Sequence, residues 1–166
     1  ARVVDRGIRE SGMIDLSQFV LEKDKSVIGL FADSVVTDHD GNLFDTCSYA
    51  AVAAIITSKI PKWEMKDDSP VLVEDQESDA PITTIPISVT MGLIGDFIIV
   101  DPNLDEWECL DARITITTNS DGNIVALQKG GDDGFSFDQL VKCSETSIAV
   151  GKEIREIVKQ ATGANK

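Results

Sequence analysis

Three of the five arginines in this chain lie within its first nine residues, and arginine is a residue type suited to binding phosphate. Arg2, Arg6 and Arg9 follow an i, i+4, i+7 spacing, which on a helix places them along one stripe. Each guanidinium group offers a planar fork of donors that matches the oxygens of a phosphate. The same arginines could instead pair with acids elsewhere in the fold, and the pattern alone leaves both interpretations open.

The overall charge limits the kind of partner that this stripe can serve. The formal net charge is −14 and the pI is near 4.3. Such a chain does not bind nucleic acid over its whole surface, because phosphate contacts need Lys and Arg. One concentrated basic site remains compatible with the charge, and a partner subunit could add more positive charge. No apolar run is long enough to span a bilayer, so no membrane partner is expected.

Length and cysteine content indicate one globular unit in a reducing, cytoplasmic setting. The 166 residues, 42% of them hydrophobic, are enough for a domain with a core. Cys47, Cys109 and Cys143 are odd in number and widely spaced, which argues against a disulfide framework or a zinc site. We expect them to be free and buried. Because Ala1 precedes the first turn without a capping side chain, we also expect a piece of a longer polypeptide that starts inside or just before a helix.

The pattern of apolar and turn residues predicts a helix, a strand, a second helix, a run of strands and a final helix. Val4 and Ile8 form the apolar face of the first helix. The other expected elements are a connector over 16–21, a strand over 26–37, a turn over 38–42, a buried helix over 43–59, an exposed acidic connection over 64–79 with a short edge strand at 71–73, strands over 85–93, 97–100, 112–118 and 124–128, a helical turn over 105–110, a flexible hinge over 130–134 and a helix over 136–161. This order predicts an α+β fold with helices packed on a mixed or antiparallel sheet.

Residues for other chemistry are sparse. His39 is the only histidine and lies in an acidic turn, which favours a surface position over a catalytic base. No phosphate-binding loop, nucleophile elbow or dinucleotide motif is present. Trp63 and Trp107 are interpreted as packing anchors rather than base-stacking residues. One acidic cluster could bind Mg²⁺, although a solvated helix flank is favoured. It consists of Asp101, Asp105, Glu106, Glu108 and Asp111.

Five segments, in order along nearly the whole chain, resemble the RNase PH-like ring subunits of the exosome. Within that family the sequence is most similar to the non-catalytic archaeal subunit and then to inactive eukaryotic ring subunits. The segments are VDRGIRES at 4–11, VTDHDGNLFD at 36–45, VDPNLDE at 100–106, LDAR at 110–113 and ALQKGG at 126–131. The resemblance implies an RNase PH-like (ribosomal protein S5 domain 2-like) fold, of which residues 1–166 form the C-terminal portion of a single domain whose N-terminal part is absent.

The resemblance also implies a place in RNA degradation. Ring subunits of this kind alternate with an active paralogue in a hetero-hexameric ring, which degrades RNA in the 3′-to-5′ direction by phosphorolysis and carries caps with S1 or KH domains. The inactive subunit lends arginines that hold the backbone of single-stranded RNA beside the active site of its paralogue. The matching positions here are Arg2, Arg6 and Arg9.

One departure from the active members bears on catalysis. Active members carry Gly-Ser-Arg where this chain has Gly41-Asn42-Leu43, and the missing pair grips the attacking phosphate at a helix N-terminus. They also place an acid in the strand turn near Gly95, where Asp96 is the candidate. We therefore expect no catalytic residue, metal or cofactor in this chain. Two alternatives remain: an active phosphorolytic enzyme with an unfamiliar phosphate site, and an acidic protein-interaction module without an RNA role.

Overall fold

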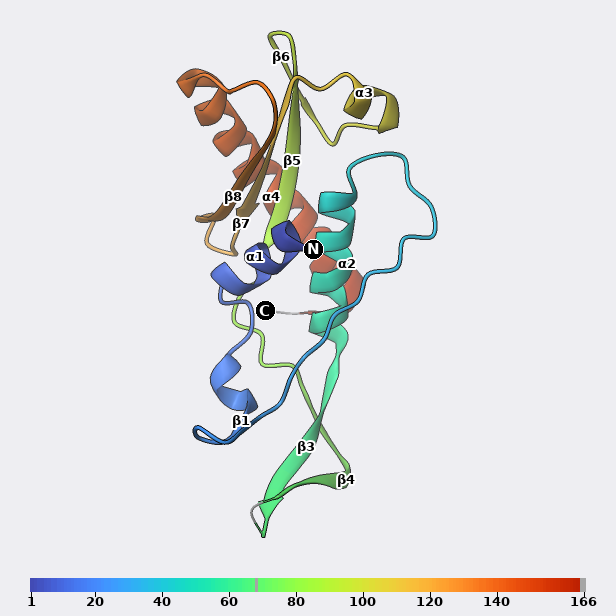
Figure 1. Ribbon diagram of the computed structural model, residues 1–166, viewed down its shortest axis with the longest axis vertical. Coiled ribbons are helices and arrows are strands. Elements are labelled where there is room, and N and C mark those ends of the chain that lie inside the picture. Colours follow the sequence, from blue (N-terminus) through green and yellow to red (C-terminus); the bar gives the residue numbers. More distant parts are fainter. Residues whose placement is uncertain (68, 165–166) are drawn as a thin grey trace.

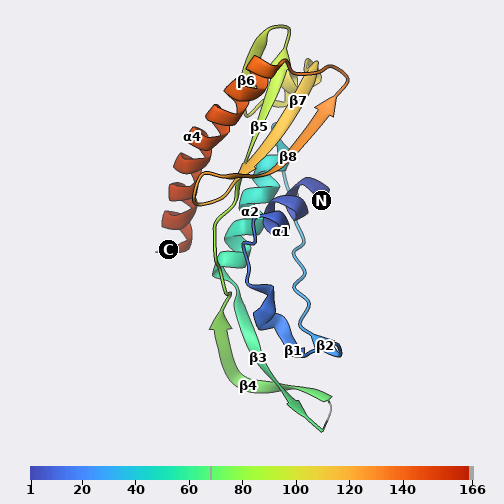
Figure 2. The same cartoon turned by 90° about the vertical axis from the view of Figure 1, so that its left-hand side faces the viewer.

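The computed structural model describes residues 1–67 and 69–164 and has an elongated shape (Figure 1). A four-stranded antiparallel sheet with the strand order β6-β5-β7-β8 forms one half. Helix α4 covers one face of this sheet, and helices α1 and α2 lie on the other (Figure 2). The strands are β5 (Ile87–Ile94), β6 (Phe97–Val100), β7 (Ala112–Thr118) and β8 (Ile124–Gly131), and the helices are α1 (Arg2–Glu10), α2 (Leu43–Thr57) and α4 (Phe137–Thr162).

The other half consists of two hairpins that extend away from the sheet (Figures 1 and 2). A 3₁₀ turn over Leu16–Phe19 leads into the short strands β1 (Val20–Glu22) and β2 (Ser26–Val27). Strands β3 (Lys59–Lys66) and β4 (Ser69–Asp79) form the longer hairpin. The short helix α3 (Leu104–Glu108) connects β6 to β7 and begins with a capping box formed by Asn103 and Glu106.

The two faces of the sheet have different cores, because side chains alternate along each strand. Toward α4 the strands present Ile87, Val89 and Ile114, which pack with Cys143 and Val158 of that helix. The opposite face is polar and equally buried. Its hydroxyl groups form two chains of hydrogen bonds, which run from Ser48 through Ser88 to Thr117 and from Asp45 through Thr90 to Thr115. The alternation in ARITITT therefore separates an apolar layer from a hydrogen-bonded one.

Helix α4 is fixed to the sheet by a buried arginine that has no carboxylate partner among the described residues. Arg155 is 4% exposed, and its Nε donates to the Ile85 carbonyl oxygen at 2.8 Å. Its Nη2 donates to the carbonyl and hydroxyl oxygens of Thr118 at 2.9 and 3.1 Å. Burial lowers the pKa of this guanidinium group. Three acceptors at the ends of two strands thus replace the ion pair that a buried charge usually needs.

Most predicted elements are confirmed, and the expected strand over 26–37 is wrong beyond Val27. Residues 28–37 are extended, but within the described chain their only backbone hydrogen bond is the one from Ile28 to Phe19. Phe31 and Val35 are 90% and 85% exposed. The segment has β-forming residues, yet a strand needs a neighbouring strand to accept and donate its hydrogen bonds.

Three further expectations need correction, and one is narrowed. The connection over 64–79 belongs to the β3–β4 hairpin, and Asp68, one of its acids, lies outside the described residues. The predicted hinge is wrong at Gly130 and Gly131, which end strand β8. Of the two sheet types that were expected, mixed or antiparallel, the structure has the antiparallel one. Of the cysteines only Cys143 is buried; Cys47 is half-buried and Cys109 is exposed. No helix in the described ranges has the length and apolar character of a membrane span.

Candidate nucleic-acid interface

Helix α1 lies close to the polar face of the sheet because a glycine lets it approach. Gly7 is buried, and a Cβ atom there would stand 3.3 Å from the side chain of Thr117. Val4 and Ile8 are half-buried on the side facing α2, as the amphipathic pattern predicts. Glycine is otherwise unfavourable inside a helix, so its position here indicates tight packing. This packing leaves the arginine stripe on the outer side of α1.

The three predicted arginines differ in their surroundings. Arg2 and Arg9 are exposed, and Arg6 is half-buried. The Nη2 of Arg9 donates to the Asp5 carboxylate at 2.9 Å, with both side chains about 60% exposed. Neither Arg2 nor Arg6 has an ion pair or hydrogen bond within the described residues. Pairing with acids therefore accounts for Arg9 alone, through an exposed contact of the kind that contributes little to stability. RNA binding by the three arginines stays a prediction.

The side chain of Arg6 lies between α1 and strands β7 and β8. It lines a small hollow with Thr115, Thr117 and Gln128, together with Val3, Ala126 and Leu127. The cross-strand register pairs Thr115 with Gln128 and Thr117 with Ala126. The hollow is therefore small and lies where α1 meets strands β7 and β8.

The start of α2 packs tightly against the loop that follows β6. Asn42 occupies the N-cap position with a left-handed φ of 35°, and its side chain makes no capping bond. Instead its Nδ2 donates to Asp45 at 2.9 Å and to Asp101 at 2.6 Å. A Cβ atom on Gly41, at φ +91°, would lie 2.5 Å from the Pro102 carbonyl oxygen. The turn before α2 is thus pressed against the loop after β6.

Asp45 places a carboxyl group inside this closed region. Its Oδ2 accepts from the backbone N–H of Thr90 at 2.7 Å, and its Oδ1 accepts from the Thr90 hydroxyl at 2.8 Å. Burial raises the pKa of Asp45 to about 6, although the hydrogen bonds from Asn42 and Thr90 oppose that shift. The same burial raises the pKa of Tyr49, whose hydroxyl donates to the Ser88 carbonyl oxygen. A carboxyl group therefore lies in the first turn of α2, which is unfavourable for an anion.

Sequence reasoning missed a group formed by Phe44, Trp107 and Arg113. The two rings contact each other with centroids 5.9 Å apart. The Arg113 Cζ lies over both rings, 5.1 Å from the Phe44 centroid and 5.2 Å from the Trp107 centroid. Trp107 is thus the packing anchor that was expected. The two-residue alternation of β7 was a usable signal, because it places Arg113 on the same face as Thr115.

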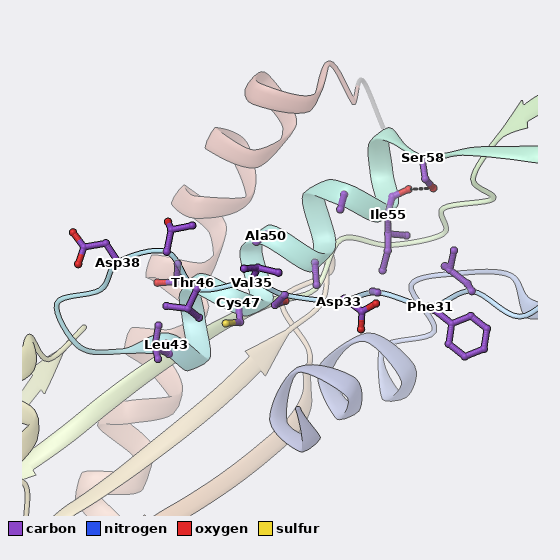
Figure 3. A pocket seen from close by; sticks show the side chains of 17 residues that line it. Phe31, Asp33, Val35, Asp38, Leu43, Thr46, Cys47, Ala50, Ile55 and Ser58 are labelled. Atoms are coloured by element: carbon purple, nitrogen blue, oxygen red, sulfur yellow. Dashed lines mark hydrogen bonds between the residues drawn. The ribbon is translucent and has the colours of Figure 1, made fainter.

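Two clefts lie beside α2 and are mostly apolar. One of about 580 Å³ separates α2 from the extended segment over residues 30–38. Figure 3 shows Leu43, Cys47 and Ile55 along it, while the ring of Phe31 points away from α2. A second cleft, of about 690 Å³, lies on the side of this segment that faces α1. Cys47 and Asp33 line both clefts, but no hydrogen bond joins them within the described residues.

The other candidate residues are scattered. Asp96 lies at the tip of the β5–β6 hairpin. It is far from the start of α2, because Thr90, which contacts that start, lies four residues before Ile94, roughly 13 Å along β5. His39 is an exposed turn residue that accepts from the Gly41 N–H. Trp63 lies in β3, which belongs to the hairpin that extends away from the sheet (Figure 1). The acidic cluster is divided among separate local bonds, and no group of three metal-ligating side chains occurs in the described ranges.

Comparison with known proteins gives a consistent family. Residues 1–61 match domain 1 of the 3′ exoribonuclease family, and residues 84–150 match domain 2 of the same family. The exosome complex component Rrp42 of Thermococcus gammatolerans is 43% identical over 165 residues, which are 99% of this chain and 60% of that protein. Rrp42 of Thermoplasma volcanium is 44% identical over 156 residues, covering 94% of this chain and 57% of the relative.

Solved structures agree in fold. An archaeal exosome core superposes with a TM-score of 0.79 and 33% identity, covering 96% of this chain and 62% of that chain. An Archaeoglobus fulgidus exosome with RNA bound to the active site gives a TM-score of 0.78 and 34% identity, with 94% of this chain and 59% of that chain covered. The chain therefore spans about 60% of the length of the curated relatives that it matches.

Proposed function

The chain belongs to the 3′ exoribonuclease family, and from this premise we propose that it forms part of a non-catalytic ring subunit of the exosome. In that role it holds single-stranded RNA for a catalytic paralogue and performs no phosphorolysis itself. The observation that carries the proposal is the stripe on α1. Arg2 and Arg9 are exposed there, and Arg2 and Arg6 have no protein acceptor in the described part of the chain. In a chain of net charge −14, such a concentration of free donors suits an anion.

The start of α2 supports the non-catalytic part of the proposal. A phosphate held at a helix N-terminus needs free N–H groups and no competing negative charge. Here Asn42 bonds to Asp45 and Asp101, and Leu43 lines an apolar cleft. These residues offer no cation to the attacking phosphate, so the chemistry would belong to the paralogue.

Exposed apolar surface beside residues 28–37 supports the proposal that residues 1–166 are the C-terminal portion of one RNase PH-like domain. The extended segment over 28–37 and the clefts on both its sides leave apolar surface that a longer subunit would cover. The remaining partners follow from the same proposal: the active paralogue in a hetero-hexameric ring, cap proteins with S1 or KH domains, and a cytoplasmic location.

The test compares two charge-matched variants of the full subunit, each assembled with its paralogue. Arg2→Ala with Arg9→Ala removes two exposed cations from α1, and Lys142→Ala with Lys152→Ala removes two exposed cations from α4 on the opposite face. We expect the first pair to weaken binding of single-stranded RNA and the second to leave it unchanged. Equal affinity for both rings would contradict RNA holding by α1 and favour an interaction module. Phosphate-dependent release of nucleoside diphosphates by the subunit alone would instead favour an active enzyme.

A further inference from the structure

Four of the five arginines lie on one side of the sheet, and the fourth of them is Arg113. It precedes Thr115 and Thr117 by two and four residues on β7, so all three side chains share the face covered by α1 and α2. Arg155, the remaining arginine, is buried under α4 on the other face. The arginines of this acidic chain are therefore distributed asymmetrically, and the positive side continues beyond α1.

The donors of Arg113 are free although its guanidinium plane is held in place. Cation–π contact with Phe44 and Trp107 positions the group, but ring faces do not take its N–H donors as carbonyl or carboxylate oxygens would. Within residues 1–67 and 69–164, Arg113 has neither a hydrogen bond nor an ion pair. The group is half-buried, so an anion that bound there would face less competition from water.

A glycine on the neighbouring strand β8 leaves space for the Arg113 guanidinium group. The register pairs Arg113 with Gly130, and a Cβ atom on Gly130 would lie 2.7 Å from the Arg113 Cζ. Any other residue would therefore have to displace the guanidinium group. Two register positions along, Gln128 lies opposite Thr115, and both residues line the hollow beside Arg6. Arg113 therefore lies two residues, about 6.6 Å along β7, from Thr115, which lines the hollow together with Arg6.

We propose that Arg113 binds a backbone phosphate of the RNA strand that α1 holds, so that the strand continues from Arg6 past Gln128 onto strands β7 and β8. This inference rests on the proposed RNA-holding function and adds a second contact surface to it. The guanidinium edge donates to the phosphate oxygens while its face stays on the two rings. Contacts of this kind position a strand without reading its bases.

The test uses Arg113→Met in the assembled ring, because methionine keeps an apolar stem against Phe44 and Trp107 while it removes the donors and the charge. We expect affinity for a single-stranded RNA to fall by about tenfold, whatever its sequence, as for the loss of one hydrogen bond to a charged group. The log–log salt slope should become shallower by about 0.7. Arg113→Lys should keep that slope and recover part of the affinity. Lys142→Met is the matched control on α4 and should change neither.

Ring assembly and melting temperature are measured on the same samples, so that a folding defect is recognised. If Arg113→Met unfolds the ring, Arg113→Lys alone decides, because it keeps the charge and loses the fork. Unchanged RNA affinity in an intact Arg113→Met or Arg113→Lys ring would overturn the inference. If that result accompanies a loss of RNA binding in the α1 variant, Arg2→Ala with Arg9→Ala, the RNA-holding function stands and only the extension to Arg113 fails. If the α1 variant binds normally, the proposed function itself fails.

Discussion

Helix α1 and the start of helix α2 lie on the same face of the sheet but differ in whether their hydrogen-bond donors are paired with carboxylates. On α1, Arg2 and Arg9 are exposed and Arg6 lines a hollow beside the sheet, and two of the three have no acceptor in the described ranges. At α2 the donor groups of Asn42 and Thr90 are already occupied by Asp45 and Asp101. A helix N-terminus is thus a poor anion site when a carboxyl group lies in its first turn, as Asp45 does here.

The largest expected effect comes from forcing open the closed start of α2. Gly41→Ala should lower the free energy of unfolding by about 3 kcal/mol or more, because φ is +91° and the new Cβ would stand 2.5 Å from a backbone oxygen. Gly95→Ala is the matched control, since φ there is +58° but no atom lies within 4 Å. It should cost about 1 kcal/mol. Denaturant unfolding of the full subunit measures both, and equal losses would show that α2 is not closed by this contact.

The second prediction uses pH to vary the charge inside α2. Asp45 has a folded pKa of about 6 against an ordinary value of 3.8, so folding is favoured while the group is protonated. That contribution is fully present below pH 3.8 and is lost as the pH rises through 6. The wild-type free energy of unfolding should therefore fall by on the order of 2–3 kcal/mol from pH 4 to pH 7, relative to Asp45→Asn. Parallel pH profiles of the two proteins would contradict a raised pKa.

The third prediction concerns the open donors on α1. Each of Arg2→Ala, Arg6→Ala and Arg9→Ala should weaken RNA binding by the ring by roughly 1–3 kcal/mol for all sequences alike. Fluorescence anisotropy over a salt series measures the affinity and its slope. Arg→Lys should recover only part of each loss because the ammonium group lacks the fork. A loss that depends on base sequence would indicate that α1 does not contact the backbone.

The smallest effect is expected from the one ion pair on α1. Asp5→Ala should lower the free energy of unfolding by less than about 0.5 kcal/mol, because its contact with Arg9 is exposed and only four residues apart. The same change should leave RNA affinity unchanged or raise it, since it frees Arg9. Thermal melting and RNA binding on one preparation give both values. A large loss of stability would mean that the arginines serve the fold after all.

Sequence patterns identified the elements that carry their own signals. The strand over Ala112–Thr118 alternates strictly and ends at a hairpin turn, and the last helix has Ser136 at its start and Gly163 at its end. Residues 26–37 failed because their composition describes a strand while pairing depends on another segment. The edge strand predicted over 71–73 lies within β4, but the rest of the β3–β4 hairpin was missed because exposed, charged strands have no apolar face to reveal them.

The site was predictable only where it is local. The arginine stripe follows from spacing within one helix, whereas Phe44, Trp107 and Arg113 come from three elements that only the fold brings together. The role of Arg155 was equally hidden, since a buried arginine without a carboxylate contradicts the usual placement of that residue.

The hydroxyl chains between α2 and the sheet have a mechanical consequence. Apolar contacts tolerate small sliding of a helix, because their energy follows buried area, but hydrogen bonds weaken steeply with distance and angle. Three residues of α2 form hydrogen bonds to β5, namely Asp45, Ser48 and Tyr49. These bonds prevent α2 from sliding along that strand. Phe44 therefore keeps its position over Arg113 even if the apolar layer under α4 loosens.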